Sequence, residues 1–250
     1  MLLAASLASA AEPRMAALLD DGTLVVFRPR EAGSRVVTLQ NVAGSLIGID
    51  RRPADGKLYG LTGSDVYRVD PEAGEATLVS TLTIPFDGDV RSGVDFTPQL
   101  DRLRLTSSDG RNLRVNVAIG ATAADTPLAY AAGNPNAGTR PRITASGYGN
   151  NKADVATTTL FEIDSGLDVL VIQDPANDGR LKTVGPISID VPDAAGMDVA
   201  TDGQGKDHAW AAWGTTLHTI DLATGRATAV GPIPGATHPV ISLAILDDLP

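Results

Sequence analysis

Residues 196–231, GMDVATDGQGKDHAWAAWGTTLHTIDLATGRATAVG, decide the fold, because their pattern recurs elsewhere in the chain. Residues 48–79 repeat it, with GID followed by KLYGL, then by VYRVDPEAG, and then by ATLV. Residues 93–120 form a third copy, which begins GVD and ends on a turn glycine. A fourth copy is degenerate at its start near residues 147–150, recovers as LFEID at 160–164 and ends as LKTVG at 181–185. Such self-similarity indicates a repeat architecture.

Each copy predicts short strands joined by tight turns. Apolar and polar residues alternate in Val66–Val69, and a period of two residues is typical of a strand. The spacing of Asp70 to Gly74, and of Asp221 to Gly225, predicts hairpins in which the Asp accepts turn amides and the Gly takes a positive φ. The 26 glycines and 16 prolines fit a chain with many turns.

The spacing of the copies predicts the number of sheets. Their starts at residues 48, 93, 147 and 196 lie 45, 54 and 49 residues apart, near the length of a four-stranded propeller blade. Residues 15–42 supply three further strands and residues 240–246 supply one. We therefore predict an all-β, five-bladed β-propeller with four-stranded blades, closed by pairing the C-terminal strand with the N-terminal strands. The structural alternative is a β-sandwich or a solenoid, although a solenoid needs capped ends and these ends complete one another.

The first residues indicate export. Residues 1–11, MLLAASLASAA, are apolar with small residues at 8 and 10, as before a signal-peptide cleavage site. No Lys or Arg precedes the stretch, so its true start lies upstream if it is a complete signal. We expect a signal peptide over 1–11, one propeller domain over 12–250, and a periplasmic or secreted protein. The alternative is an ordinary apolar first strand, and no segment is long enough to span a bilayer.

Composition narrows the partners. Thirty acidic and 20 basic residues give a net charge of −10 with no basic run, so nucleic acid is not an expected partner. The absence of cysteine removes disulfides, thiolate nucleophiles and thiol metal sites. No P-loop, G-x-S-x-G or H-E-x-x-H motif occurs, and no cofactor is evident. We expect a monomer that binds an unknown small molecule or protein.

The Asp that follows each leading glycine is the first candidate site. Asp50, Asp95 and Asp198 hold equivalent places, and Asn150 is expected to hold the fourth. If the leading strand is innermost, these side chains form a ring near the central channel, and a ring of oxygen ligands suits Ca²⁺ or another hard cation. The alternative is that each Asp only caps a turn by accepting backbone amides.

A polar run in the third copy is the second candidate site. Three arginines on neighbouring predicted strands can present guanidinium groups to a carboxylate or phosphate ligand. The alternative is that they pair with Asp95 and Asp101 to hold blades together. The run consists of Asp101, Arg102, Arg104, Asn112, Arg114 and Asn116.

The same copy carries a family resemblance. GVDFTP (93–98), DRLR (101–104) and GRNLRVN (110–116), with QDPANDG (173–179) and LKTVG (181–185), resemble a bacterial domain-of-unknown-function family, number 4394. The resemblance runs from about residue 17 to about residue 233. It implies a propeller-like, often exported domain without an assigned reaction, and it supplies no catalytic residues.

Three functions remain open from the sequence. We expect a non-catalytic binding or scaffold propeller, since the repeat accounts for nearly every residue singled out. A metal-dependent, lactonase-like hydrolase is the first alternative, and it requires the three Asp to converge on one ion. A protein–protein interaction module is the second. The fold cannot decide among these functions, because propellers host many unrelated ones.

Overall fold

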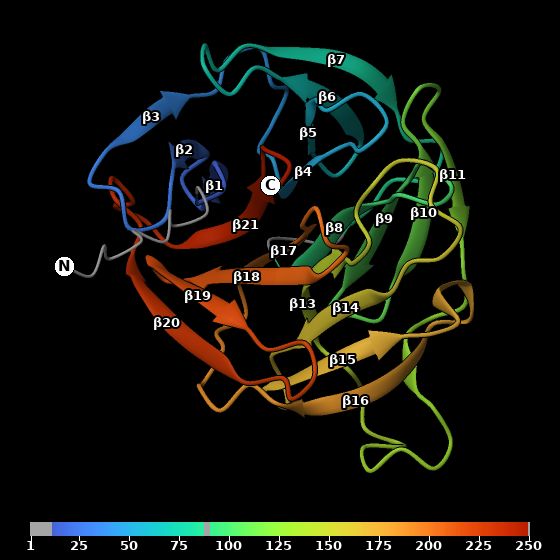
Figure 1. The fold of residues 1–250 in the computed structure, drawn as a ribbon. Helices are drawn as coiled ribbons and strands as arrows, with labels where there is room; N and C mark the ends of the chain where they lie inside the picture. Colours follow the sequence, from blue (N-terminus) through green and yellow to red (C-terminus); the bar gives the residue numbers. More distant parts are fainter. Residues whose placement is uncertain (1–11, 88–90, 250) are drawn as a thin grey trace, which may run out of the picture.

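The computed structural model describes residues 12–87 and 91–249, and within them it shows five sheets set around a central axis (Figure 1). In each sheet one strand lies innermost and the others follow outward to the rim. The innermost strands contact one another in sequence around the axis, and the last contacts the first. The predicted all-β, five-bladed propeller is confirmed. The expected signal peptide, residues 1–11, lies outside the described residues.

The blades are numbered here along the chain, and their strands are given from the axis outward. Blade one consists of β21 (Val240–Ile245), β1 (Met15–Leu19), β2 (Thr23–Phe27) and β3 (Ser34–Thr38). Blade two consists of β4 (Gly48–Arg51), β5 (Leu58–Leu61), β6 (Asp65–Val69) and β7 (Ala76–Thr81). Blade three consists of β8 (Ser92–Thr97), β9 (Arg102–Ser107), β10 (Asn112–Asn116) and β11 (Ala121–Ala124).

Blades four and five follow the same plan. Blade four consists of β13 (Ile143–Tyr148), β14 (Leu160–Asp164), β15 (Val169–Gln173) and β16 (Arg180–Pro186), with a 3₁₀ turn η1 (Ala176–Asp178) before β16. Blade five consists of β17 (Gly196–Thr201), β18 (Asp207–Trp213), β19 (Thr216–Ile220) and β20 (Ala227–Pro232).

Blade one closes the ring as predicted. β1 pairs with β21 in antiparallel register, with Met15 opposite Ile245 and Ala17 opposite Leu243. All five residues of β1 and all six of β21 are buried, because both strands lie between two neighbouring blades. Because the two ends of the chain pair within one blade, neither end leaves an unpaired strand edge there.

The hairpins of the repeat have the predicted chemistry. Asp70 Oδ1 accepts from Glu72 N at 2.7 Å, and Gly74 (φ 76°) donates its N–H to Asp70 O at 2.8 Å. In blade five, Asp221 Oδ1 accepts from Ala223 N at 2.9 Å, and Gly225 has a φ of 82°. The Asp therefore binds the turn amides while the Gly takes the left-handed conformation that other residues avoid.

Blade four departs from the repeat in two ways. Residues 160–164 form its second strand, whereas the sequence pattern aligned them with third strands such as Val66–Asp70, and that alignment is wrong. A short additional strand, β12 (Ala129–Tyr130), pairs in parallel with β16 at the rim. The segment 125–131, called the strap below, leads to β12 and binds two blades. Leu128 N donates to Gly110 O in blade three, and Ala131 N donates to Leu181 O in blade four, each at 2.9 Å.

Side chains of neighbouring blades meet in seams, and most seams are apolar. Among the described residues, large apolar clusters fill four of the five seams, all except the one between blades three and four. Each large side chain that is fully buried there contributes about 1.5–3 kcal/mol to folding. The cluster between blades two and three includes Tyr59, Leu61, Val94, Phe96 and Leu105.

The seam between blades three and four, called the polar seam below, is built differently. It has a smaller apolar cluster, which includes Leu128 and Tyr130 of the strap. Polar side chains that are no more than 2% exposed also lie there, and they are Arg104, Thr106, Asn112, Ser146, Glu162, Asp164 and Gln173. This seam is where buried polar chemistry concentrates outside the channel.

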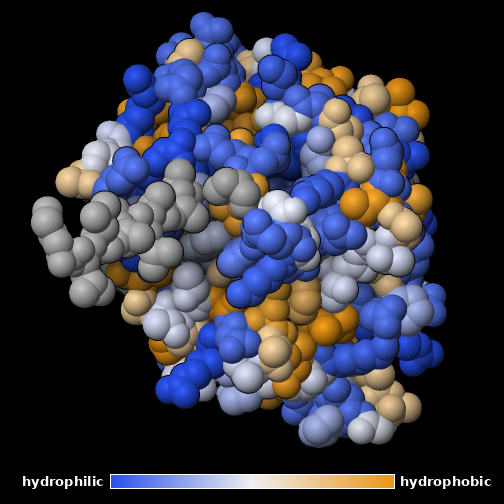
Figure 2. All heavy atoms as spheres, viewed as in Figure 1, coloured by the Kyte–Doolittle hydropathy of each residue, from blue (hydrophilic) through white to orange (hydrophobic). Residues whose placement is uncertain are grey.

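The outer surface is mixed in character. The face shown in Figure 2 is mostly hydrophilic, with hydrophobic residues in separate patches. Large exposed apolar side chains are spread over different blades and include Val36, Leu78 and Ile119. In the part of the chain that the structure describes, no helix has the length and apolarity needed to cross a bilayer.

Candidate functional site

The innermost strands bring Asp50, Asp95 and Asp198 together at the axis. One carboxylate oxygen from each lies within 4.8 Å of those of the other two, and the residues are only 1–2% exposed. Three atoms no further apart than this lie within about 2.8 Å of a common centre, a distance compatible with the 2.3–2.6 Å of a Ca²⁺–oxygen bond. The convergence expected from the repeat is therefore present, and the three residues are called the channel triad below.

The fourth place in the ring belongs to Gly147. Asp50 Oδ2 accepts from the amide of Phe96, the residue after Asp95, at 2.7 Å. Asp95 Oδ1 accepts in the same way from the amide of Tyr148, at 3.3 Å, so Gly147 is the equivalent of Asp95 in blade four. The expectation for Asn150 is wrong, because that residue follows the end of β13 and its amide donates to Asp207.

Backbone amides already hold most of the triad oxygens. Asp50 Oδ1 accepts from Arg51 N at 2.7 Å, and Asp198 accepts from Val199 N and from Ile245 N, each at 2.6 Å. The Asp side chains thus join the inner strand of one blade to that of the next, which a turn cap does not do. One buried oxygen, Asp95 Oδ2, has no hydrogen-bond partner among the described residues.

Burial makes the charged form of the triad costly. It raises the pKa of Asp50 and of Asp95 well above their ordinary value, and the neighbouring carboxylates raise both further. Burial also raises the pKa of Asp198 to about 7, against the opposing effect of two backbone amides. Three carboxylates this close cannot all ionise alone, so the triad must share protons or bind a cation.

Arg51 stands at one end of the channel. It follows Asp50 directly, and its positive charge lowers the pKa of both Asp50 and Asp198. Its Nη1 is 2.8 Å from Asp248 Oδ1. Arg51, Ile245 and Asp248 line a cavity of about 240 Å³ together with residues of blades four and five. The cavity adjoins the triad through Ile245, because Ile245 lines the cavity and its amide binds Asp198.

Half of the polar run in blade three gathers in one network. Arg104 donates to Asn112 Oδ1 at 2.7 Å, to Asp125 Oδ2 at 2.6 Å and to Asn177 Oδ1 at 2.7 Å. Arg114 binds the same Asp125 with two hydrogen bonds, at 2.6 and 2.9 Å. These guanidinium groups are committed to protein partners, which supports the structural alternative over a phosphate or carboxylate ligand.

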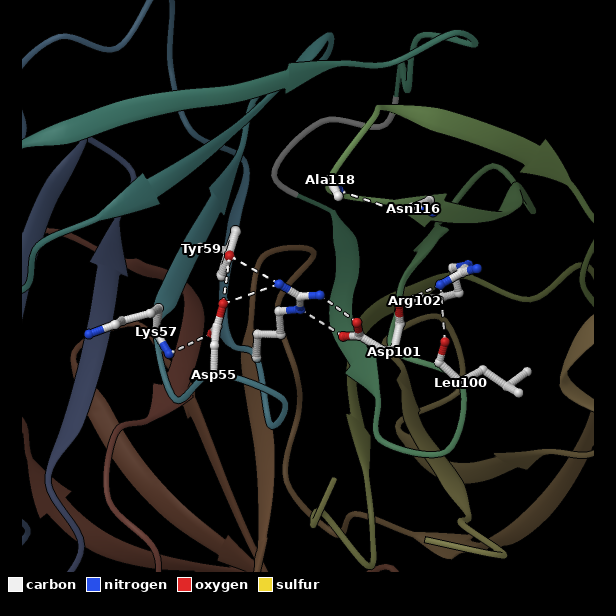
Figure 3. A network of polar contacts seen from close by, with 9 residues as sticks. Asp55, Lys57, Tyr59, Leu100, Asp101, Arg102, Asn116 and Ala118 are labelled. Carbon is white, nitrogen blue, oxygen red and sulfur yellow. Dashed lines mark hydrogen bonds and ion pairs between the residues drawn. The ribbon is translucent and has the colours of Figure 1, made fainter. Parts of the chain in front are cut away.

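The other three residues of the run lie elsewhere. Asp101 pairs with Arg52 of blade two, beside the Asp55–Tyr59 contact (Figure 3). Arg102 donates to the carbonyls of Leu100 and Asp101, at 3.1 and 2.9 Å. Asn116 Oδ1 accepts from Ala118 N at 3.2 Å and so caps its own turn (Figure 3). Asp101 does join two blades, but its partner is an arginine outside the run.

Strand register shows how the polar seam arises. Asp95 is opposite Arg104 in blade three, as Asp50 is opposite Tyr59 in blade two, so Arg104 takes the place of an aromatic residue. Ser146 is opposite Glu162 in blade four, as Val94 is opposite Leu105 in blade three. Polar residues thus replace apolar ones on both sides of a single seam.

Glu162 is the residue that the sequence reasoning missed. It is fully buried, and burial raises its pKa to about 8, although the nearby Thr106 hydroxyl and Arg104 guanidinium oppose the rise. If the sequence had been aligned with β14 as a second strand, Glu162 would have stood at the position of Leu105, where an acid is unexpected. Asp125 and Asn177 were missed as well, since both lie outside the regular strands.

Comparison with known proteins agrees with the fold. A family model described as a domain of unknown function, DUF4394, matches residues 23–244. The chain belongs to this family. The match to DUF4394 covers blades two to five and all of blade one except β1 and the end of β21, so it includes the triad and the polar seam. The resemblance expected from the blade-three motifs is confirmed. No curated protein matches this DUF4394 chain in sequence.

Solved structures share the fold of this DUF4394 domain at low identity. One is a structural genomics protein of unknown function from Bacteroides thetaiotaomicron, with a TM-score of 0.54 and 15% identity. The alignment covers 96% of this chain but only 66% of that protein. Another, from work on the de novo evolutionary emergence of a symmetrical protein, has a TM-score of 0.53 and 15% identity over 95% of this chain and 99% of that one. At these identities the likeness shows the fold alone.

Proposed function

We propose that this protein is an exported, non-catalytic binding propeller whose channel triad holds a divalent cation of the Ca²⁺ class. Its N-terminal sequence supports export, and the channel supports the cation. The observation that carries the proposal is Asp95 Oδ2, a buried carboxylate oxygen that faces two other carboxylates and has no hydrogen-bond partner in the described residues. A hard cation supplies the missing partner and offsets the repulsion within the triad.

Burial favours a cation that holds blades together over a catalytic one. A hydrolase must present its metal to substrate with an open coordination position. Here the triad residues are at most 2% exposed, and the adjoining cavity is lined by the ion pair of Arg51 and Asp248. The amides of Phe96, Tyr148 and Ile245, each on the inner strand of the next blade, already hold one oxygen of each triad residue. The cation would therefore strengthen the ring and leave ligand binding to the rest of the disc.

Thermal unfolding of the chain in EDTA, and then with added Ca²⁺ or Mg²⁺, tests this function. At a hundredfold excess over its Kd, a cation that binds only the folded protein stabilises it by about 2.7 kcal/mol. For a domain of this size that is a rise of roughly 5–10 °C in Tm. Asp95→Asn should abolish the rise, whereas Asp190→Asn, at an exposed aspartate, should leave it intact.

Two results would change the proposal. An unshifted Tm with both cations would leave the triad as proton-sharing links between blades. Ca²⁺-dependent hydrolysis of an aromatic lactone that disappears in Asp95→Asn would replace the binding function with the hydrolase.

A further inference from the structure

The polar seam contains buried oxygens that the protein itself does not satisfy. Within the described residues, Thr106 Oγ1, Ser146 Oγ and both carboxyl oxygens of Glu162 have no hydrogen-bond partner. All three residues are no more than 2% exposed. Buried polar groups in folded proteins are nearly always paired, so a cluster of unpaired ones indicates a bound species.

These oxygens face a common space. A Cβ atom added to Gly93 would lie 2.5 Å from Ser146 Oγ and 2.6 Å from Thr106 Oγ1, so both hydroxyls close around that glycine. Glu162 is directly opposite Ser146 in the β13–β14 ladder. Thr106 lies close enough to Glu162 to oppose the rise in its pKa, yet it does not meet hydrogen-bond geometry. Side chains from blades three and four therefore converge on one small polar site.

The charge around the site is unbalanced toward the negative. On this side of the two blades, Arg104 and Arg114 share a single carboxylate, that of Asp125. Two further carboxylates, those of Glu162 and Asp164, are buried in the same seam, and among the described residues Asp164 binds the Tyr130 hydroxyl and the Gly166 amide. Two arginines thus face three carboxylates, and buried negative charge without a counter-ion is costly.

We propose that the polar seam is a second cation site, which binds a monovalent ion such as Na⁺ through the carboxylate of Glu162 and the hydroxyls of Thr106 and Ser146. Oxygen ligands suit a hard cation, and one carboxylate with neutral hydroxyls matches a single positive charge. Arg104, on the same side, disfavours a second charge. The ion joins blade three to blade four where the apolar cluster is smallest, and it does not depend on the channel triad.

Thermal unfolding of the full chain in EDTA, with NaCl compared with choline chloride at equal ionic strength, tests the site. We expect the Tm to be several degrees higher in NaCl. Glu162→Gln should lose this difference, and Glu31→Gln, at an exposed glutamate, should keep it. Should Glu162→Gln fail to fold, the double variant Glu162→Leu with Ser146→Val restores the apolar pair of the neighbouring seam and should also show no difference.

The outcomes separate the two sites. Equal Tm values in NaCl and choline chloride would overturn the sodium site and leave a protonated Glu162 in its place. A sodium response of full size in the double variant would overturn it too, because that variant lacks two of the three ligands. The Ca²⁺ response of the channel triad should survive in Glu162→Gln, so failure of one proposal can be told from failure of the other.

Discussion

The seams on the two sides of blade three show what one fold can do with two chemistries. Toward blade two, Val94 and Leu105 join an apolar cluster that includes a Tyr59–Phe96 edge contact with ring centroids 5.4 Å apart. Toward blade four, the equivalent backbone positions carry Ser146 and Glu162, and the facing strand carries Arg104 and Thr106. The strand pairing at these positions is equivalent, and the side chains differ.

The comparison shows that one seam of this propeller can have polar side chains in place of apolar ones while the other seams stay apolar. A ring of five blades keeps its shape when four seams are apolar, so the fifth can bury charges that add little to stability themselves. Polar substitution on both faces of one seam is therefore a better sign of a site than any single unusual residue. The predictions below alter one seam to resemble the other, beginning with the largest expected effect.

Leu105→Glu gives the apolar seam the acid of the polar seam. The new carboxyl would lie among Val94, Phe96 and Leu103 with no polar partner nearby, so we expect a loss of about 4 kcal/mol or more, or failure to fold. Urea unfolding measures it. Leu105→Met keeps the volume and should cost less than about 1.5 kcal/mol. A stable Leu105→Glu variant would mean that the two seams are interchangeable.

Arg104→Met removes the central cation of the polar seam. Asp125 keeps its two hydrogen bonds to Arg114, so we expect a loss near the lower end for a broken buried pair, about 3 kcal/mol. Arg102→Met, which removes only hydrogen bonds to loop carbonyls, should change stability by less than about 0.5 kcal/mol. Equal effects of the two substitutions in urea unfolding would show that the network is not a buried unit.

Glu162→Leu combined with Ser146→Val converts the polar seam to the pattern of its neighbour. Replacing buried polar groups with packed apolar ones is often stabilising by about 1–4 kcal/mol, so in choline chloride with EDTA we expect a gain of about 2 kcal/mol. Urea unfolding at pH 8 measures the change. Each single substitution should gain less than the pair, because the two side chains are cross-strand neighbours. A loss of stability would show that the seam has no room for the pair.

The last prediction is a pH dependence of stability. The folded pKa of Glu162, about 8, lies above its ordinary value of 4.5, so the folded protein holds this proton longer than the unfolded chain. Its contribution is fully favourable below pH 4.5 and is lost as the pH rises toward 8. Arg104, Thr106, Ser146, Tyr148 and Asp164 are the polar groups that face it.

The corresponding measurement is Tm against pH in choline chloride with EDTA. The unaltered protein should lose several degrees between pH 5 and pH 8. The double variant should lose less, because it lacks the Glu162 carboxyl while the channel triad and the histidines titrate in both proteins. Identical slopes would show that Glu162 does not keep its proton when folded.

The sequence predicted the fold well because its signals are local and repeated. We could predict the hairpins at Asp70 and Asp221 from turn chemistry alone. We could predict the pairing of the chain ends from the number of strands that each end supplies. The same repetition brought Asp50, Asp95 and Asp198 together, since equivalent positions on inner strands must meet at the axis. The prediction that they bind a cation is one that the geometry permits and leaves for experiment.

The site was predicted less well where the repeat is interrupted. A loop of eleven residues, 149–159, separates β13 from β14, and it shifted the alignment of blade four by one strand. Asn150 was therefore placed in the ring instead of Gly147, and Glu162 was not singled out as a candidate. Arg104 binds Asp125 of the strap and Asn177 of η1. Neither residue lies in a regular strand of the repeat, so the sequence pattern could not predict that they lie beside Arg104.

The strap has a mechanical consequence. Because segment 125–131 is hydrogen-bonded to blade three through Leu128 and to blade four through Ala131, spreading these two blades apart at the rim must break backbone bonds as well as separate side chains. Backbone bonds also cross other seams, since Gln40 N donates to Gly74 O, Thr83 N to Gly120 O and Ala227 N to Ile187 O. Under thermal motion or an applied pull, the rim of the disc should therefore resist opening at several seams, and opening the polar seam should in addition bring its buried charged side chains into contact with water.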